Sequence, residues 1–293
     1  MATLYTHQDS NIRKTWFLMT GFLIVVIAVG WGFSYYFESP AILYIAVILA
    51  VLTNIYSYWN SDKLVIKMTG AVPVTKESHP DLWNVVENLS ITAGLPMPRV
   101  YVVNDPAPNA FATGRDPEHA VVAATTGLLS ILDRTELEGV IAHELSHVGN
   151  RDMLVSTVAV VLVGFVAILA DIFLRLTFYG RGRRQEGRAG AIIFLIGIIA
   201  AILLPIATRL IQFAVSRKRE FLADASGALL TRYPEGLASA LEKISAYGQP
   251  MKKASHATAH LFIANPFGGR ETLGRLFSTH PPVEERIKAL RER

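Results

Sequence analysis

The residues best suited to chemistry lie in one short stretch, His143-Glu144-Leu145-Ser146-His147. In a helix, two histidines four positions apart project from one face, so both imidazoles can bind a single zinc ion. Glu144 lies beside them and can take a proton from a water molecule on that zinc. The ordinary alternative is a pair of solvated or hydrogen-bonded surface histidines. The amphipathic surroundings of the motif favour a metal site.

A helix is predicted over residues 135–149 to carry this motif. Thr135 is the predicted N-cap, and Glu138, three residues on, completes a capping box. Gly149 stands where helices commonly stop. Apolar residues recur at helical spacing between these ends and predict a buried face: Leu137, Val140, Ile141, Leu145 and Val148.

The composition points to a membrane protein. The chain is 51% hydrophobic and 18% charged, with a mean hydropathy of +0.34, which is too apolar for an ordinary soluble domain. The net charge of +4 is modest, and no basic tract is interleaved with aromatic residues, so a membrane surface is favoured over nucleic acid. Because there is no cysteine, a zinc ion must rest on histidine and carboxylate ligands.

Four apolar runs are of membrane length: residues 16–37, 41–59, 153–170 and 189–208. The first two predict a transmembrane hairpin. A cleavable signal peptide is the alternative for the first run, but the run continues past the small-residue site at Ala28 and Gly30. Lysine and arginine residues flank this hairpin on both sides, so both flanks are predicted to face the cytoplasm.

The second hairpin, residues 153–213, leaves two alternatives. Pro205 would kink or break its last helix. A shared zinc site requires both ends of the hairpin on one side, which puts an arginine-rich loop (175–188) on the far side, against the positive-inside rule. Either this loop is translocated despite its charge, or the hairpin does not fully cross. The lengths of the runs favour two crossings.

Residues 62–133 have the composition of a soluble domain. A helix is predicted over 79–93, ended by Gly94. Strands are predicted at 64–71, 99–103 and 119–125 from their apolar and β-branched content.

A second acidic motif follows the second hairpin, on a predicted helix over 216–227. A catalytic zinc needs three protein ligands and an open position, and Glu220 is the candidate third ligand. Asp224, one turn on, can accept a hydrogen bond from a ligating imidazole. The alternative is a solvated acidic pair among basic residues, and spacing alone does not separate the two.

Three further histidines compete for roles. His256 and His260 form another pair four apart, but no glutamate lies between them, so polar or core histidines are favoured. His280 lies in a proline-rich turn before a terminal amphipathic helix, where it can polarise a substrate carbonyl. Its surroundings in the sequence do not decide that role.

Taken together, these motifs resemble the HtpX-type membrane zinc endopeptidases, which are gluzincins related to the CAAX prenyl proteases. The resemblance extends over nearly the whole chain. It implies that His143, His147 and Glu220 bind zinc, that Glu144 is the general base, and that Asp224 is hydrogen-bonded to a ligand.

The same resemblance implies further site residues. The segment Asn109-Ala110-Phe111-Ala112 resembles the family's strand beside the substrate cleft. His280 and Arg286 resemble the pair that steadies the tetrahedral intermediate.

The expected fold is α+β: a mainly helical membrane protein with about four hydrophobic helices and a gluzincin-like domain with a small β-sheet. The expected divisions are 1–61, 62–152, 153–213 and 214–293. The resemblance implies one zinc ion per chain, polypeptide substrates drawn from membrane proteins, contact with the lipid bilayer and no nucleic acid. It implies a multi-pass protein of the bacterial cytoplasmic (inner) membrane, facing the cytoplasm, in protein quality control. A narrow-specificity processing peptidase and a non-enzymatic membrane adaptor with a structural zinc site remain alternatives.

Overall fold

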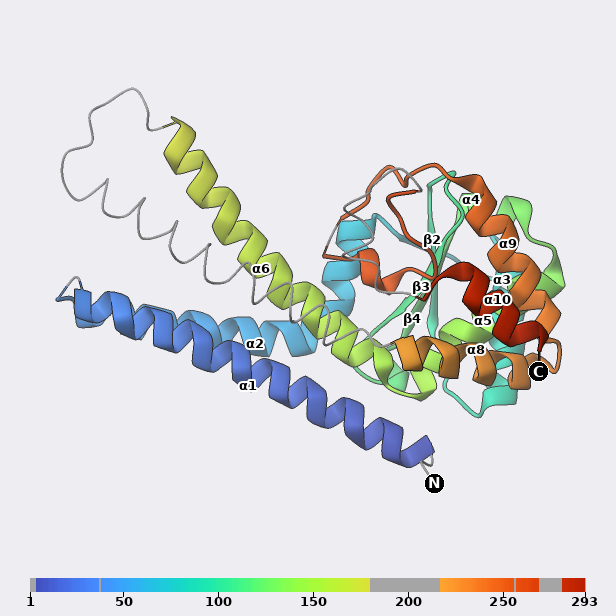
Figure 1. Ribbon diagram of the computed structural model, residues 1–293, viewed down its shortest axis with the longest axis horizontal. Helices are drawn as coiled ribbons and strands as arrows, with labels where there is room; N and C mark the ends of the chain where they lie inside the picture. The colour runs from blue at the N-terminus through green and yellow to red at the C-terminus, as the bar shows by residue number, and fades with distance from the viewer. Residues whose placement is uncertain (1–3, 37, 180–216, 256, 269–280, 293) are drawn as a thin grey trace.

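The structure, a computed structural model, describes residues 4–36, 38–179, 217–255, 257–268 and 281–292. In Figure 1, long helices extend from one side of a mixed domain that contains the sheet. The predicted fourth apolar run and the arginine-rich segment 181–188 lie outside the described residues. The helices are α1 (Leu4–Tyr36), α2 (Pro40–Thr69), α3 (Pro80–Ala93), α4 (Thr126–Ile131), α5 (Arg134–Gly149), α6 (Asp152–Tyr179), α8 (Arg217–Thr231), α9 (Pro234–Tyr247) and α10 (Val283–Arg291).

The N-terminal hairpin is present as two helices. The stretches Asp9–Gly32 of α1 and Pro40–Thr69 of α2 both have a mean hydropathy of 1.9 and are long enough to cross a membrane. Gly30 lets the two helices approach closely, since a Cβ there would lie 2.3 Å from the Cβ of Ala46. The stretches Arg134–Gly149 of α5 and Asp152–Phe165 of α6 are together long and apolar enough to cross a membrane, but they meet at 82°.

The strand predicted over 64–71 is wrong, because α2 continues to Thr69. Buried residues recur every three or four positions through this part of α2, including Ser57, Ser61 and Val65. That spacing is helical and keeps one face packed beside its neighbours. Gly70, in the left-handed conformation at φ 70°, ends the helix. The division expected at residue 61 therefore falls inside a continuous helix.

The sheet has four strands in the order β1-β2-β4-β3. The strands are β1 (Val72–Pro73), β2 (Arg99–Val103), β3 (Ala110–Thr113) and β4 (Val121–Thr125). Strands β2 and β4 are parallel, whereas β1 and β3 pair antiparallel with their neighbours. The strand predictions at 99–103 and 119–125 are confirmed, the second with a later start because a 3-10 turn occupies Pro117–His119.

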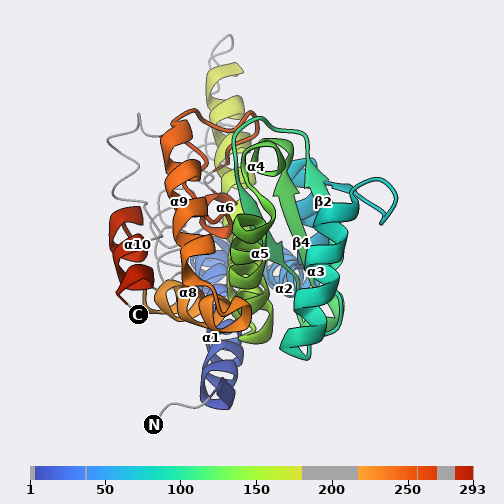
Figure 2. The same cartoon turned by 90° about the vertical axis from the view of Figure 1, so that its right-hand side faces the viewer.

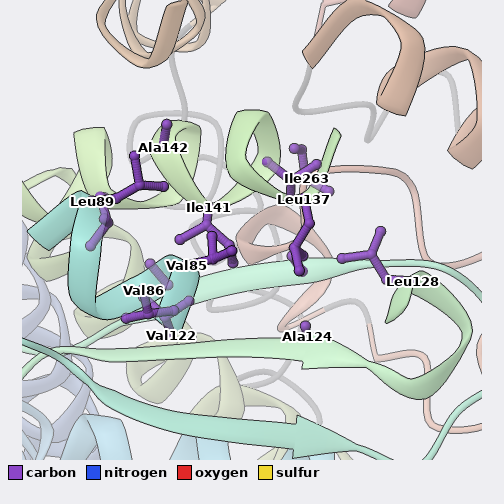
Figure 3. Close-up of a cluster of buried hydrophobic side chains, with 14 of the residues drawn as sticks. Val85, Val86, Leu89, Val122, Ala124, Leu128, Leu137, Ile141, Ala142 and Ile263 are labelled. Carbon is purple, nitrogen blue, oxygen red and sulfur yellow. The ribbon is translucent and has the colours of Figure 1, made fainter. Parts of the chain in front are cut away.

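Helix α5 lies in the middle of the domain, with α3 and α9 as neighbours (Figure 2). Its apolar face packs with α3 onto the sheet, and Figure 3 shows Leu137 and Ile141 directed toward the strand that carries Val122 and Ala124. The mainly helical α+β fold with a small sheet, as predicted, is confirmed. Because α5 is buried on nearly all sides, the motif that it carries is held in the interior.

Candidate metal centre

The N-terminal end of α5 differs from the prediction. Asp133, rather than Thr135, is the N-cap, and its carboxylate accepts the backbone N–H of Glu136 at 2.9 Å. The Glu136 carboxylate in turn accepts the Asp133 N–H at 2.8 Å. Both Asp133 with Glu136 and Thr135 with Glu138 match the capping-box pattern. The tertiary structure selects the first, because Lys243 of α9 pairs with Glu136 at 2.7 Å.

The histidines of α5 face each other as their spacing predicts. The Nε2 atoms of His143 and His147 are 3.2 Å apart, and the two rings stand at right angles. His143 is 1% exposed, so it lies inside the domain rather than on its surface. The surface-pair alternative is therefore excluded.

Glu220 reaches the same point from α8. Its carboxylate oxygens lie 3.9 Å from Nε2 of His143 and 3.6 Å from Nε2 of His147. The close approach of the two helices depends on Gly227, where a Cβ would lie 2.9 Å from the backbone nitrogen of His143. The alternative of a solvated acidic pair is excluded, because Glu220 and Asp224 are both buried.

The three side chains are arranged as a tetrahedral metal site requires. One ligand atom from each of His143, His147 and Glu220 lies within 4.8 Å of the others. Ligands about 2.0–2.1 Å from a tetrahedral zinc ion are separated by about 3.3–3.4 Å. The separations of 3.2, 3.6 and 3.9 Å between the ligand atoms are close to that value, so the residues fit a zinc ion with only small shifts.

The electrostatics of the site also favour a cation. Burial alone lowers the pKa of His147, but its hydrogen bond with Asp152 and the charge of Glu220 outweigh burial and raise that pKa to about 9. This environment stabilises a positive charge between His147 and the carboxylates, which a bound metal ion would supply.

Glu144 is buried beside the ligands and lines the same cavity as the histidines and Glu220. Burial raises its pKa to about 7, and the charge of Glu220 acts in the same direction. A hydrogen bond from the backbone of Ala112, on β3, opposes this rise. A carboxyl group poised near neutrality can both accept and return a proton.

Asp224 holds His143 in place. Its Oδ1 lies 2.9 Å from Nδ1 of His143, so a neutral imidazole that donates from Nδ1 directs the lone pair of Nε2 toward the metal position. Burial lowers the pKa of His143 to about 4, which keeps the imidazole neutral. The structure thus places Asp224 where the predicted hydrogen-bonding partner of a ligand must be.

Arg286, on α10, is completely buried and pairs with Asp224. Its Nε and Nη2 atoms donate to the two Asp224 oxygens at 2.9 and 2.7 Å. The same Nη2 lies 3.5 Å from Nδ1 of His143. Arg286 therefore lies behind the ligand, on the side away from the metal position.

The segment predicted to lie beside the substrate forms β3, next to α5. Ala112 lines the cavity at the metal position. Ala110 already accepts a hydrogen bond from the Ile263 N–H at 2.9 Å, and Phe111 forms a β-bridge with Phe262. The Asn109 side-chain amide donates to the backbone oxygen of Ala264 at 3.0 Å, so it joins β3 to residues 262–264.

Two of the predicted histidines, His256 and His280, lie outside the described residues. His260 is buried, lines the cavity, and has its Nε2 3.1 Å from the Ser156 backbone oxygen.

The sequence alone did not indicate a role for Asp152, whose Oδ2 lies 3.3 Å from Nδ1 of His147. Its position shortly after His147 is the signal that could have identified it.

Fold and site together define a membrane-anchored metallopeptidase. A model of peptidase family M48 matches residues 76–293. Proteins named "Protease HtpX homolog" align along nearly the whole chain. That of Caldanaerobacter subterraneus subsp. tengcongensis is 49% identical over 99% of this chain and 97% of its own. That of Tropheryma whipplei is 48% identical over 99% of this chain and 98% of its own.

The chain therefore belongs to peptidase family M48, among its HtpX-type members, and is a metalloprotease as predicted. Among solved structures it is similar to the crystal structure of S. mikatae Ste24p, with a TM-score of 0.51 at 17% identity. That similarity covers 98% of this chain and 67% of the other, and it supports the fold.

Proposed function

We propose that the chain is a zinc-dependent endopeptidase of the bacterial cytoplasmic membrane that degrades damaged or misfolded membrane proteins from the cytoplasmic side. The observation that carries the proposal is the convergence of His143, His147 and Glu220 on one point, with Glu144 in the same cavity. Two imidazoles and a carboxylate suit zinc best among the common divalent ions.

Zinc bound at this point would polarise the scissile carbonyl and make water a stronger nucleophile near neutral pH. Glu144 takes the proton of the attacking water and delivers it to the leaving amine. Its pKa of about 7 suits both transfers, since neither form is strongly favoured at neutral pH. Asp224 keeps Nε2 of His143 unprotonated and directed at the position that zinc would occupy.

An extended substrate would bind beside β3 by main-chain hydrogen bonds, which give affinity with little sequence preference. Along β3 the backbone N–H and C=O groups point alternately toward β4 and toward the opposite edge of the strand. Those of Ala110 and Ala112 point toward the opposite edge. Because Ala110 is already paired with Ile263 and the Ala112 N–H donates to Glu144, we place the substrate contact at the Ala112 carbonyl, beside the metal position.

His280 and Arg286 were predicted to stabilise the oxyanion. For His280 this stays a proposal, since the residue lies outside the described ones. For Arg286, the buried ion pair with Asp224 favours a different role: Arg286 holds Asp224 in place, and Asp224 in turn holds His143. A direct contact with substrate would require Arg286 to leave that ion pair.

The cytoplasmic orientation is supported by charge. Arg13 and Lys14 precede the apolar part of α1, and Lys63, Lys67 and Lys76 follow the apolar part of α2. The turn between these helices carries Glu38. Both ends of the hairpin are therefore expected on the cytoplasmic side, together with the domain that they join.

The test is cleavage of casein and of a destabilised membrane protein by the purified full-length chain, wild type beside Glu144→Gln. We expect Glu144→Gln to retain zinc, measured with a chromophoric chelator, and to lose about 10²- to 10⁴-fold in rate. Chelation should abolish wild-type cleavage, and added zinc should restore it.

Cleavage that survives both chelation and Glu144→Gln would refute the proposal. Zinc bound without cleavage of any substrate would support the adaptor alternative. Sequencing of the products separates the remaining two possibilities, because a processing peptidase cuts one site whereas a quality-control enzyme cuts many.

A further inference from the structure

The second ligand, His147, is supported by a carboxylate that lies beyond the end of α5. Asp152 begins α6 and is 4% exposed, with its Oδ2 3.3 Å from Nδ1 of His147. A carboxylate in this position fixes the orientation of an imidazole and makes the opposite nitrogen a better ligand. Asp152 is itself held by Arg219, the neighbour of Glu220, with 3.3 Å between Nη1 and Oδ1.

Asp152 reaches His147 because the chain bends sharply between α5 and α6. The two helices meet at 82°, and Arg151 at the bend has a φ of 56°. That left-handed conformation is unfavourable for a residue with a side chain. It persists only where surrounding contacts hold it.

Asn11, near the start of α1, supplies such contacts. Its side-chain amide donates to the backbone oxygen of Asn150 at 3.0 Å and to Oδ1 of Asp152 at 2.6 Å. Both N–H groups of the amide are thus used, one on each side of Arg151. Asn11 is 3% exposed, so these hydrogen bonds are shielded from water.

Apolar packing along α1 and α6 fixes this contact. Leu18 of α1 packs with Val155 and Ala159 of α6 in a buried cluster. Further along, the rings of Phe22 and Phe165 meet edge to face with centroids 5.9 Å apart. The hydrogen bond between Asn11 and Asp152 is the first of these contacts between α1 and α6. The position of α1 beside α6 therefore determines whether it forms (Figure 1).

We infer that Asn11 is a positioning residue of the metal centre, through which the N-terminal membrane helix orients His147 by way of Asp152. The helix is then part of the site as well as an anchor. The inference rests on the proposed zinc site. It means that loosening α1 from α6 weakens metal binding even when the catalytic domain stays folded.

The test compares zinc affinity of the full-length protein, by competition with a chromophoric chelator, and the visible spectrum of the cobalt-substituted form. We expect Asp152→Asn to lower zinc affinity about 10- to 100-fold, and Asn11→Leu to lower it up to about tenfold. Both variants should change the cobalt spectrum. Thr15→Val is the matched control, because the Thr15 hydroxyl bonds only the Asn11 backbone oxygen within α1 in the described contacts.

A double-mutant cycle tests whether Asn11 acts through Asp152. Asn11→Leu should cause no further loss of affinity when Asp152→Asn is already present. Additive losses, or a wild-type cobalt spectrum in Asn11→Leu, would overturn the inference. Failure of the wild type to bind zinc would instead refute the proposed function.

If Asn11→Leu does not fold, the exchange variant Asn11→Asp with Asp152→Asn keeps a hydrogen bond between the helices but presents an amide to His147. We expect it to fold, with a lower melting temperature because the Asn150 carbonyl loses its donor, and to have the zinc affinity of Asp152→Asn. Wild-type affinity in the exchange variant would show that no carboxylate is needed and would overturn the inference.

Discussion

His143 and His147 lie one turn apart on α5, yet their supporting carboxylates belong to different parts of the molecule. Asp224 and Arg286 come from α8 and α10 of the catalytic domain, and their side chains are 3% and 0% exposed. Asp152 lies at the root of α6, and its other hydrogen-bonding partners include Asn11 of the membrane hairpin. We call Asp224 with Arg286 the domain support, and Asp152 with Asn11 the membrane support.

The difference has a physical consequence. The domain support forms when the catalytic domain folds, since every group in it belongs to that domain. The membrane support also requires α1 to lie beside α6. His143 is therefore oriented by domain folding alone, whereas the orientation of His147 depends also on the packing of membrane helices.

The largest effect is expected from breaking the domain support. Arg286→Leu would leave the Asp224 carboxylate buried without its cation, which costs about 3–5 kcal/mol of unfolding free energy. Thermal unfolding in mild detergent measures the loss. Arg291→Leu is the matched control on α10, because that arginine pairs with Glu235 at the surface and its removal should have little effect. Equal melting temperatures for the two variants would contradict the account.

The next effect concerns the helix that carries the domain support. Gly227→Ala would place a methyl group against the His143 backbone and push α8 away from α5. Overpacking of this kind costs about 1–3 kcal/mol, and here it should also lower zinc affinity because Glu220 moves with the helix. Gly164→Ala, on α6, has no atom within 4 Å of its added Cβ and serves as the control. Unchanged zinc affinity in Gly227→Ala would show that α8 tolerates the shift.

A smaller effect separates the two supports directly. Transfer of the wild type from detergent to a lipid bilayer should raise zinc affinity a few-fold, because the bilayer holds α1 against α6. Asp152→Asn should lose this dependence, whereas Asp224→Asn should keep it. Chelator competition in both environments makes the measurement. The same lipid response in both variants would remove the distinction between the supports.

The smallest effect is expected at the far end of α5. Asp133→Ala removes the N-cap and should lower the melting temperature slightly without changing zinc affinity, since both supports lie near the other end. Thr135→Ala should lower it less, because that hydroxyl donates to Asp133 and does not cap the helix. If Thr135→Ala lowered the melting temperature more than Asp133→Ala, Thr135 would be the cap.

Much of the site was predictable because it is encoded locally. His143, Glu144 and His147 share one helical turn, and the spacing of a helix alone brings the two imidazoles together. The two N-terminal apolar helices are encoded by length and composition. Glu220 needed more: the chemistry of zinc and the absence of cysteine made it the candidate third ligand, but only the resemblance to a family favoured this role over a solvated acidic pair.

Other features were decided by contacts that no local pattern contains. The capping box of α5 matched two registers, and α9 selected the first through Lys243. The strand expected at 64–71 became the end of α2, since packing against neighbouring helices outweighed its β-branched residues.

The sequence by itself determined the pair of histidines with the glutamate between them, the helix that carries it and the class of enzyme, because each depends on residues close together in the chain or on a family pattern. The tertiary structure decided which groups hold the two histidines. Asn11 and Asp152, like Asp224 and Arg286, are far apart in the chain and become partners only when their helices pack. Burial then makes each of these polar groups depend on its partner, since water is no longer available to replace it.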